Sequence, residues 1–325
     1  MKEANVDLAS EPFERVPCPL CGEDGASALF TAPAPDDPAD VFTVEACNAC
    51  GMAYVNPRPT PEALARRYAD DYYAYEFYGA RRLRHRIKAR ILRALKLLPP
   101  PGPDEPVPAT ARLTGAAVRA LRGARAVSSL PAPRAGARYL DVGCGAGNGM
   151  AHAREAGWET FGVDFSERAI AVAHEHDFPG MVADALQLPV AGESFDFVEM
   201  THMLEHTTDP VGVLREAARV LRPGGTVHLV VPSLSAWSAG RFGPDWMALD
   251  LPRHLLHFTP GTMRIAAERA GLRVAAIRAL PNRWVFEASM ERLELSAAAE
   301  RLTRLQWRLH CALGRGEDLN VWLTT

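Results

Sequence analysis

Residues 139–148 read Tyr139-Leu140-Asp141-Val142-Gly143-Cys144-Gly145-Ala146-Gly147-Asn148, and this stretch decides the fold. An apolar strand ends, three glycines follow at alternate positions, and a helical pattern begins directly after them. Glycine adopts backbone angles that other residues avoid, and without a Cβ it lets the main chain lie against a ligand. The next apolar run ends at Asp164, where a carboxylate is placed to accept hydrogen bonds from both hydroxyls of a ribose. These features predict a binding site for a nucleoside derivative.

Five motifs in the same order resemble those of class I S-adenosylmethionine (SAM)-dependent methyltransferases, over residues 136 to about 280. They are the glycine loop with Asp141, then Asp164, Asp184 in Val182–Pro189, the run Phe195–Met200, and the turn Leu221–Thr226. The resemblance implies that Asp141, Gly143, Gly145 and Gly147 hold the methionine half of SAM, that Asp164 holds the ribose and that Asp184 lies by the adenine. It also implies cofactor contacts from Phe165, Ala185 and Thr201. The alternative, a nicotinamide-binding domain, has a different fingerprint, G-x-G-x-x-G.

Strand and helix patterns alternate as far as Val231, which predicts a doubly wound parallel α/β sheet. The resemblance implies a Rossmann-like sheet of seven strands, with 320–325 returning as the antiparallel last strand. Helices are expected over 148–157, from Ser166 to 176, from Asp209 to 222 and from Thr259 to 271, with a strand over 272–280. Residues 284–313 read as a long helical insertion, a candidate lid or homodimer contact.

The composition is that of a globular protein of about two domains. The chain has 325 residues, 48% of them hydrophobic, and a formal net charge of −3, so any nucleic-acid contact requires a local basic patch. The first residues are polar and no apolar run reaches the roughly 18 residues of a membrane span. We therefore expect a cytoplasmic protein without a membrane span.

Four of the six cysteines form two C-x-x-C pairs, each followed by glycine: Cys18 with Cys21, and Cys47 with Cys50. This spacing predicts a four-thiolate Zn²⁺ site, and short strands at 29–31 and 41–45 between the pairs favour a zinc ribbon. Such a site has no open position for catalysis, so its role is structural, supplying about 10 kcal/mol or more of coordination energy. A redox dithiol or chance spacing is the alternative.

The chain divides into four parts: a zinc ribbon (1–60), a helical and tyrosine-rich segment (61–98), a proline-rich linker with a short helix (99–135) and the methyltransferase domain (136–325), with insertions at 232–258 and 281–316. Thr60 and Pro61 open a helix over 62–69. Tyr72 and Tyr73 are candidates for a lid over the cofactor, or pack the ribbon against the main domain. Residues 81–96 carry eight Lys or Arg and no acid, which fits a solvated helix face or a surface for RNA or anionic lipid.

Three histidines are candidates for catalysis. His254 and His257 lie in the insertion beside an arginine and an aspartate, and are preferred as a general base over His202, which follows strand four. Metal binding by His254 and His257 has no third ligand at an obvious spacing, and a loop that only seals the cofactor is the main competitor. In the family that the chain resembles, the first histidine and the Leu-Glu-His group at 204–206 often shape the site without proton chemistry.

The sequence thus predicts methyl transfer to a small molecule, such as a secondary metabolite or a sugar-linked precursor, at an oxygen, nitrogen or carbon atom. The alternative is an RNA base methyltransferase that uses the ribbon and the basic helix 81–96. A non-catalytic scaffold is disfavoured by the intact glycine loop and its three acids.

Overall fold

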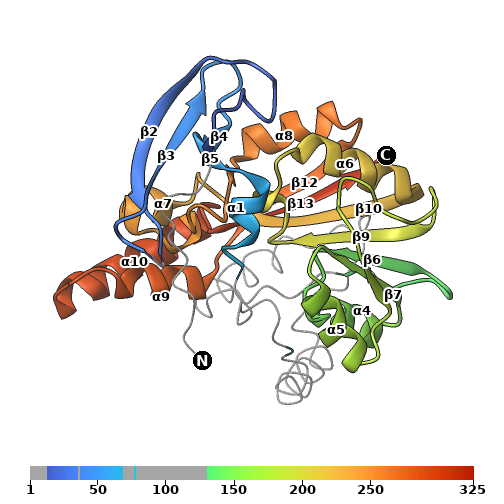
Figure 1. The fold of residues 1–325 in the computed structure, drawn as a ribbon. Coiled ribbons are helices and arrows are strands. Elements are labelled where there is room, and N and C mark those ends of the chain that lie inside the picture. Colours follow the sequence, from blue (N-terminus) through green and yellow to red (C-terminus); the bar gives the residue numbers. More distant parts are fainter. Residues whose placement is uncertain (1–12, 36, 69–76, 78–129) are drawn as a thin grey trace, which may run out of the picture.

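The computed structural model describes residues 13–35, 37–68, 77 and 130–325 (Figure 1). Four sequence-based predictions lie outside these residues: the tyrosine lid at Tyr72 and Tyr73, the basic helix 81–96, the linker 99–108 and the helix at about 110–126.

The centre of the molecule is a seven-stranded sheet in the order β12-β13-β10-β9-β6-β7-β8. Its strands in chain order are β6 (Arg138–Val142), β7 (Glu159–Asp164), β8 (Gly180–Val182), β9 (Phe195–Thr201), β10 (Leu221–Pro232), β12 (Arg273–Leu280) and β13 (Asp318–Thr324). The neighbours from β8 to β10 pair in parallel, whereas β13 is antiparallel to both β10 and β12. The predicted doubly wound sheet with an antiparallel last strand is confirmed.

Helices cover both faces of this sheet. They are α4 (Asn148–Ala156), α5 (Glu167–Glu175), α6 (Pro210–Val220) and α8 (Pro260–Arg269). Figure 1 shows α4 and α5 on one face and α6 and α8 on the other. The buried side chains divide accordingly: α4 and α5 contribute to one apolar cluster with Trp158 and Phe197, and α6 and α8 to the larger one. The central strands β6, β9 and β10 are consequently buried along most of their length.

Side-chain caps start the helices where the sequence predicts them. Ser166 accepts from the backbone N–H of Ala169, and Thr259 and Thr262 form a reciprocal capping box at α8. Asp209 caps α6, but that helix ends at Val220, two residues before the expected 222, because Leu221 is already extended and begins β10.

The N-terminal ribbon is a four-stranded sheet in the order β11-β4-β3-β2, with a small pair β1-β5 beside it. Its elements are β1 (Phe13–Glu14), β2 (Ala26–Pro33), β3 (Val41–Cys47), β4 (Ala53–Val55), β5 (Arg58–Pro59) and α1 (Pro61–Ala65). Helix α1 is shorter than the predicted 62–69, since the N–H of Arg67 bonds to the carbonyl of Leu64 in a closing turn.

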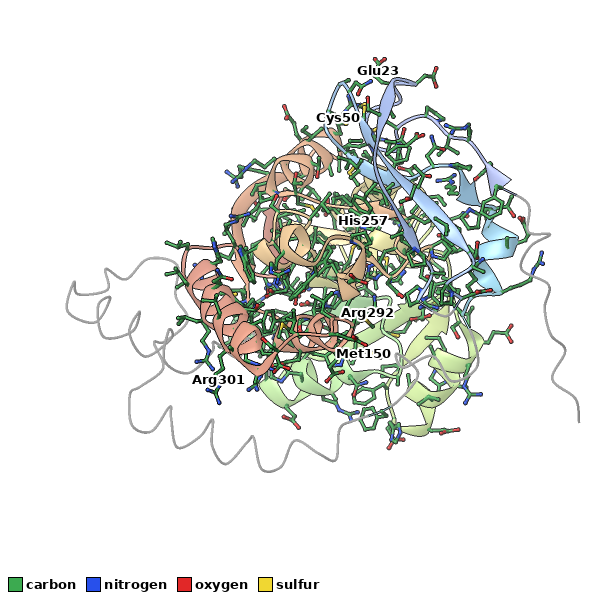
Figure 2. The ribbon with its side chains drawn as sticks, turned by 90° about the vertical axis from the view of Figure 1, so that its left-hand side faces the viewer. Glu23, Cys50, Met150, His257, Arg292 and Arg301 are labelled. Atoms are coloured by element: carbon green, nitrogen blue, oxygen red, sulfur yellow. The ribbon has the colours of Figure 1, made fainter. Side chains whose placement is uncertain are left out.

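The fourth strand of the ribbon sheet, β11 (Leu256–His257), comes from the insertion that follows β10. His257 pairs with Ala53 and Leu256 with Tyr54, in antiparallel register. In the view of Figure 2, His257 lies between Cys50 of the ribbon and Met150 of α4. The ribbon and the insertion thus share one hydrogen-bonded sheet.

Short helices build the two insertions. The first contains α7 (Trp237–Phe242), η5 (Gly243–Asp245) and η6 (Met247–Leu249), and the second contains α9 (Arg283–Glu291) and α10 (Ala297–Ala312). A further short helix, η4 (Leu204–His206), lies outside the insertions, between β9 and α6. The predicted helical insertion 284–313 is therefore two helices, because Ser296 caps a new start at α10. Within the described residues, every helix is too short or too polar to cross a bilayer.

Candidate active site

The two acids of the glycine motif end adjacent parallel strands. Asp141 in β6 and Asp164 in β7 are 4% and 8% exposed. The carboxylate of Asp164 accepts the backbone N–H of Gly145 at Oδ2 and that of Ser166 at Oδ1, both at 2.9 Å. The glycine loop is thus fastened to the carboxyl end of β7, at the edge where ligands bind in such sheets.

The loop requires glycine for geometric reasons. Gly143, Gly145 and Gly147 have φ of +77°, +50° and +86°. A Cβ on Gly143 would lie 2.5 Å from Cγ of Met203, and one on Gly147 would lie 3.0 Å from the ring of Phe178. A side chain at Gly143 or Gly147 would therefore meet both an unfavourable φ and a close neighbour.

Burial dominates the electrostatics of this edge. It raises the pKa of Asp141 well above its ordinary value, and the nearby charges of Glu199 and Asp164 add to the effect. Burial also raises the pKa of Asp164, against the backbone N–H groups of Ser166 and Gly145 that favour the anion. Both carboxylates are therefore poorly solvated.

The remaining predicted cofactor residues line the same edge. Phe165 follows Asp164 and is 58% exposed, and its ring meets that of Tyr68 edge to face, with centroids 5.4 Å apart. Asp184 is exposed and accepts the N–H of Leu186, while Ala185 is half-buried. Thr201 is exposed at the end of β9, and its hydroxyl donates to Oε1 of Glu199 at 2.7 Å.

His202 follows β9 in a strained conformation, with φ of +52°. Its side chain is 32% exposed and lies between two carboxylates: Nδ1 is 3.3 Å from Oε1 of Glu205, and Nε2 is 3.9 Å from Oδ2 of Asp318. Burial alone lowers the pKa of His202, but the hydrogen bond to Glu205 and the charge of Asp318 outweigh it and raise the pKa to about 9. A positive-φ histidine held by two acids is typical of a functional position.

His254 and His257 are less accessible, at 6% and 3% exposed. Nδ1 of His254 lies 2.9 Å from the carbonyl oxygen of Ala248, so this nitrogen carries the proton. His257 lies in β11 with its Nε2 buried and, within the part of the chain that the structure describes, without a hydrogen-bond partner. Burial and the neighbouring His254 lower the pKa of His257 to about 3, which keeps its imidazole neutral.

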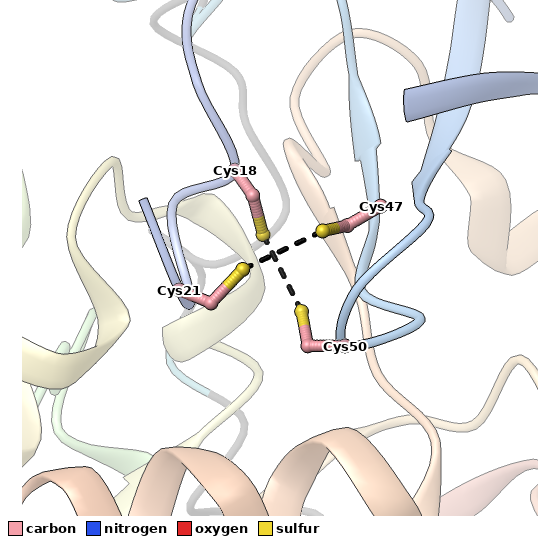
Figure 3. A group of neighbouring side chains, drawn as sticks. All are labelled: Cys18, Cys21, Cys47 and Cys50. Carbon is pink, nitrogen blue, oxygen red and sulfur yellow. Dashed lines mark hydrogen bonds between the residues drawn. The ribbon is translucent and has the colours of Figure 1, made fainter. Parts of the chain in front are cut away.

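The four cysteines of the ribbon converge, as Figure 3 shows. Sγ of Cys18 is 3.5 Å from that of Cys50, and Sγ of Cys21 is 3.5 Å from that of Cys47. The four sulfurs lie within 4.8 Å of one another, and none is in a disulfide. A tetrahedral metal with thiolate bonds of about 2.3 Å fits this arrangement.

Comparison with known families agrees with this geometry. Residues 80–277 match the family model described as a methyltransferase domain. The chain belongs to this methyltransferase family. The predicted class I SAM-dependent methyltransferase is confirmed, and its sheet is the one that this class uses.

Named relatives of this methyltransferase include ubiquinone biosynthesis O-methyltransferases. That of Ralstonia nicotianae is 34% identical over 163 residues, which cover 46% of this chain and 68% of the relative. That of Aromatoleum aromaticum is 31% identical over 157 residues, covering 44% and 67%. A crystal structure of a SAM-dependent methyltransferase from Archaeoglobus fulgidus matches with a TM-score of 0.44 and 21% identity, over 58% of this chain and 86% of that one.

The fold of this methyltransferase also places side by side residues that the sequence analysis did not connect. Glu205 and His206 lie beside His254, although they are separated from it by β10 and most of the first insertion. Asp318, at the start of β13, reaches His202. The Leu-Glu-His group was visible in the sequence as a motif, whereas nothing local marked Asp318.

Proposed function

We propose that this methyltransferase transfers the methyl group of SAM to a hydroxyl oxygen of a small-molecule acceptor. The observation that carries the proposal is Asp164, a buried strand-end carboxylate fastened to Gly145 and followed by an exposed aromatic ring, Phe165. This arrangement fits an adenosine, because the acid accepts ribose hydroxyls and the ring offers a stacking surface.

Each predicted cofactor residue has a role in this proposal. Asp164 would hold the ribose, Asp184 and Ala185 the adenine, and the backbone of the glycine loop 143–147 with Asp141 the methionine half. Thr201 would border the methyl group from the end of β9. When bound, SAM supplies a methyl group on a positively charged sulfur that is an excellent leaving group. The protein then has to align donor and acceptor and exclude water.

We assign the acceptor contact to His202. Of the three candidate histidines, His202 is the one with a substantially exposed side chain, and it adjoins Thr201 at the strand end. The low exposure of His254 and His257 weighs against direct contact by either with an acceptor. The names of the relatives, which are O-methyltransferases of ubiquinone biosynthesis, support a hydroxyl acceptor of low molecular weight.

The RNA alternative finds no such support. The basic segment 81–96, its main argument, lies outside the described residues, and the relatives named above are ubiquinone biosynthesis O-methyltransferases. We keep it as an outcome of the test below.

We further propose that Cys18, Cys21, Cys47 and Cys50 bind a structural Zn²⁺. The four thiols converge at distances suited to one ion and none of them is in a disulfide, which supports this assignment. With all four positions filled by sulfur, the ion would stabilise the ribbon and the β4–β11 pairing rather than take part in catalysis.

The test is methyl transfer by the purified full chain, followed as S-adenosylhomocysteine formation, with phenols, catechols and hydroxylated sugars as separate acceptor panels. Turnover with a hydroxyl acceptor that is lost in His202→Ala, with SAM binding retained, supports the proposal. Product formation only with RNA, or methylation only at nitrogen or carbon, would overturn it.

A further inference from the structure

Three side chains from two distant segments meet beside the candidate acceptor site. Glu205 and His206 lie in η4, directly after β9, and His254 lies in the first insertion, between η6 and β11. One ligand atom of each, a carboxylate oxygen and two imidazole nitrogens, lies within 4.8 Å of the other two. The two imidazole rings meet nearly perpendicular, with centroids 4.6 Å apart. None of these atoms belongs to the four-cysteine site.

Both histidines are oriented by backbone carbonyls. Nδ1 of His254 is 2.9 Å from the oxygen of Ala248, and Nδ1 of His206 is 2.9 Å from the oxygen of Arg253. A carbonyl only accepts hydrogen bonds, so each Nδ1 carries a proton, and in the neutral ring each Nε2 keeps a lone pair. Nδ1 of His206 also lies 2.9 Å from the hydroxyl oxygen of Tyr68, which can share this proton as a second acceptor. Metal-binding histidines in proteins show this pattern, in which an outer carbonyl fixes the tautomer and the free nitrogen serves as ligand.

The carboxylate of the group is incompletely satisfied. Glu205 is 0% exposed, and its Oε1 is 3.3 Å from Nδ1 of His202. Its Oε2 is buried and has no hydrogen-bond partner among the described residues. An unpartnered carboxylate oxygen away from water is costly. The oxygen that faces His254 is Oε1, 4.0 Å from Nε2, so a cation among the three side chains would bind the carboxylate through Oε1 and offset the cost of burying its charge.

We propose that Glu205, His206 and His254 form a second metal site, which binds a first-row divalent cation, Zn²⁺ before others. Two imidazoles and one carboxylate are the ligand set of many zinc and non-haem iron centres. Because such ligands lie about 2.0–2.2 Å from zinc, the three side chains close slightly on the ion. Three protein ligands leave a coordination position for water or another oxygen.

Asp250 stays outside this ligand set. Its Oδ2 lies 3.8 Å from Nε2 of His254, but Arg253 holds the same carboxylate with hydrogen bonds of 3.1 and 2.6 Å. The site would join the end of β9 to the insertion that carries β11, independently of which acceptor the enzyme methylates.

The test begins with the metal content of the full chain, dialysed with Zn²⁺ and then against metal-free buffer, by mass spectrometry. We expect two zinc ions per wild-type chain, and one in Glu205→Gln and in His254→Ala. The matched control is His257→Ala, which removes a buried imidazole three residues away that is not a ligand, and should keep two. SAM binding by each variant serves as the check on folding.

Cobalt replacement separates the two sites. The first equivalent of Co²⁺ should give the intense sulfur-to-metal absorption of a thiolate site, and a second should add only weak bands of a nitrogen and oxygen site that Glu205→Gln abolishes. One ion per wild-type chain under both metals would overturn the proposal. So would two ions in every variant, which would leave the cluster as a hydrogen-bonded network. Neither measurement depends on methyl transfer, so it can fail while the proposed function holds.

Discussion

The backbone N–H of Gly145 donates to Oδ2 of Asp164 at 2.9 Å, so that one hydrogen bond joins the glycine loop after β6 to the carboxyl end of β7. The same carboxylate also accepts from Ser166, the residue that caps α5. One side chain therefore sets the position of the loop, the next helix and the proposed ribose site.

Replacing this carboxylate should weaken cofactor binding. Asp164→Asn keeps the size of the side chain but loses charged hydrogen bonds to the ribose, each worth about 1.5–3 kcal/mol, so we expect SAM affinity to fall about 10- to 100-fold. Titration calorimetry measures it. Glu159→Gln, at the exposed opposite end of β7, is the control and should bind like the wild type. Unchanged affinity in Asp164→Asn would remove the ribose assignment.

The affinity for SAM should also depend on pH. Burial raises the pKa of Asp164 above its ordinary 3.8. As the pH falls through this raised pKa, the carboxyl group gains a proton and accepts ribose hydroxyls less well, so SAM binding weakens at a pH where a solvated aspartate is still ionised. A binding curve against pH that is equally steep in Asp164→Asn would contradict this assignment.

The stability of the ligand-free chain should respond to Asp164 in the opposite direction. Its folded pKa exceeds its unfolded pKa, so the folded state binds the proton more tightly. The contribution of this group to the free energy of unfolding is fully present below the unfolded pKa and is lost as the pH rises through the folded pKa. Urea unfolding of wild type and Asp164→Asn across this range isolates the effect, which should be absent from the variant.

Two glycines with the same φ allow the cost of backbone strain to be measured separately from the cost of a steric clash. Gly143 and Gly224 both have φ of +77°, but a Cβ on Gly143 meets Met203 at 2.5 Å, whereas one on Gly224 meets nothing within 4 Å. Gly224→Ala should cost about 1–2 kcal/mol of stability from backbone strain alone. Gly143→Ala should cost about 1–3 kcal/mol more. Chemical denaturation measures both, and equal losses would argue against the contact with Met203.

Glu317, directly after the second insertion (281–316), should stabilise that insertion through its buried carboxylate. It is 0% exposed and accepts from Nε1 of Trp307 at 2.6 Å and from the backbone N–H of Asn282 at 2.9 Å. Glu317→Ala leaves both donors buried and unpaired, so we expect a loss of about 3 kcal/mol or more. Glu300→Gln, whose side chain is 46% exposed in a loose ion pair with Arg304, should change the unfolding free energy by less than about 0.5 kcal/mol.

Removing the ribbon metal should loosen the insertion. The amides of Leu256 and His257 belong to a strand paired with β4, close to Cys50, so loss of the proposed Zn²⁺ removes their partner strand. Chelation, or Cys47→Ser, should speed hydrogen exchange in 256–258 by about tenfold or more while leaving β6 and β7 protected. Exchange that is unchanged in 256–258 would show that the strand pairing stands without the metal.

Much of the fold was predictable because its signals are local. The glycines from Gly143 to Gly147, the caps at Ser166 and Thr259 and the spacing of each cysteine pair depend on residues within a few positions of one another. The two errors in helix boundaries also have local causes. The sequence pattern did not show that the chain becomes extended at Leu221 and begins β10, or that Ser296 caps a second helix within the predicted 284–313.

The sequence by itself determined the alternation of strands and helices, the cofactor loop and the four-thiol cluster, since short-range geometry and hydrophobic periodicity encode them. Only the tertiary structure decided that His254 meets Glu205 and His206, that Asp318 faces His202 and that β11 completes the sheet of the ribbon. These contacts join segments that are far apart in the chain. They form only when the whole sheet has packed, and no local pattern of residues encodes that packing.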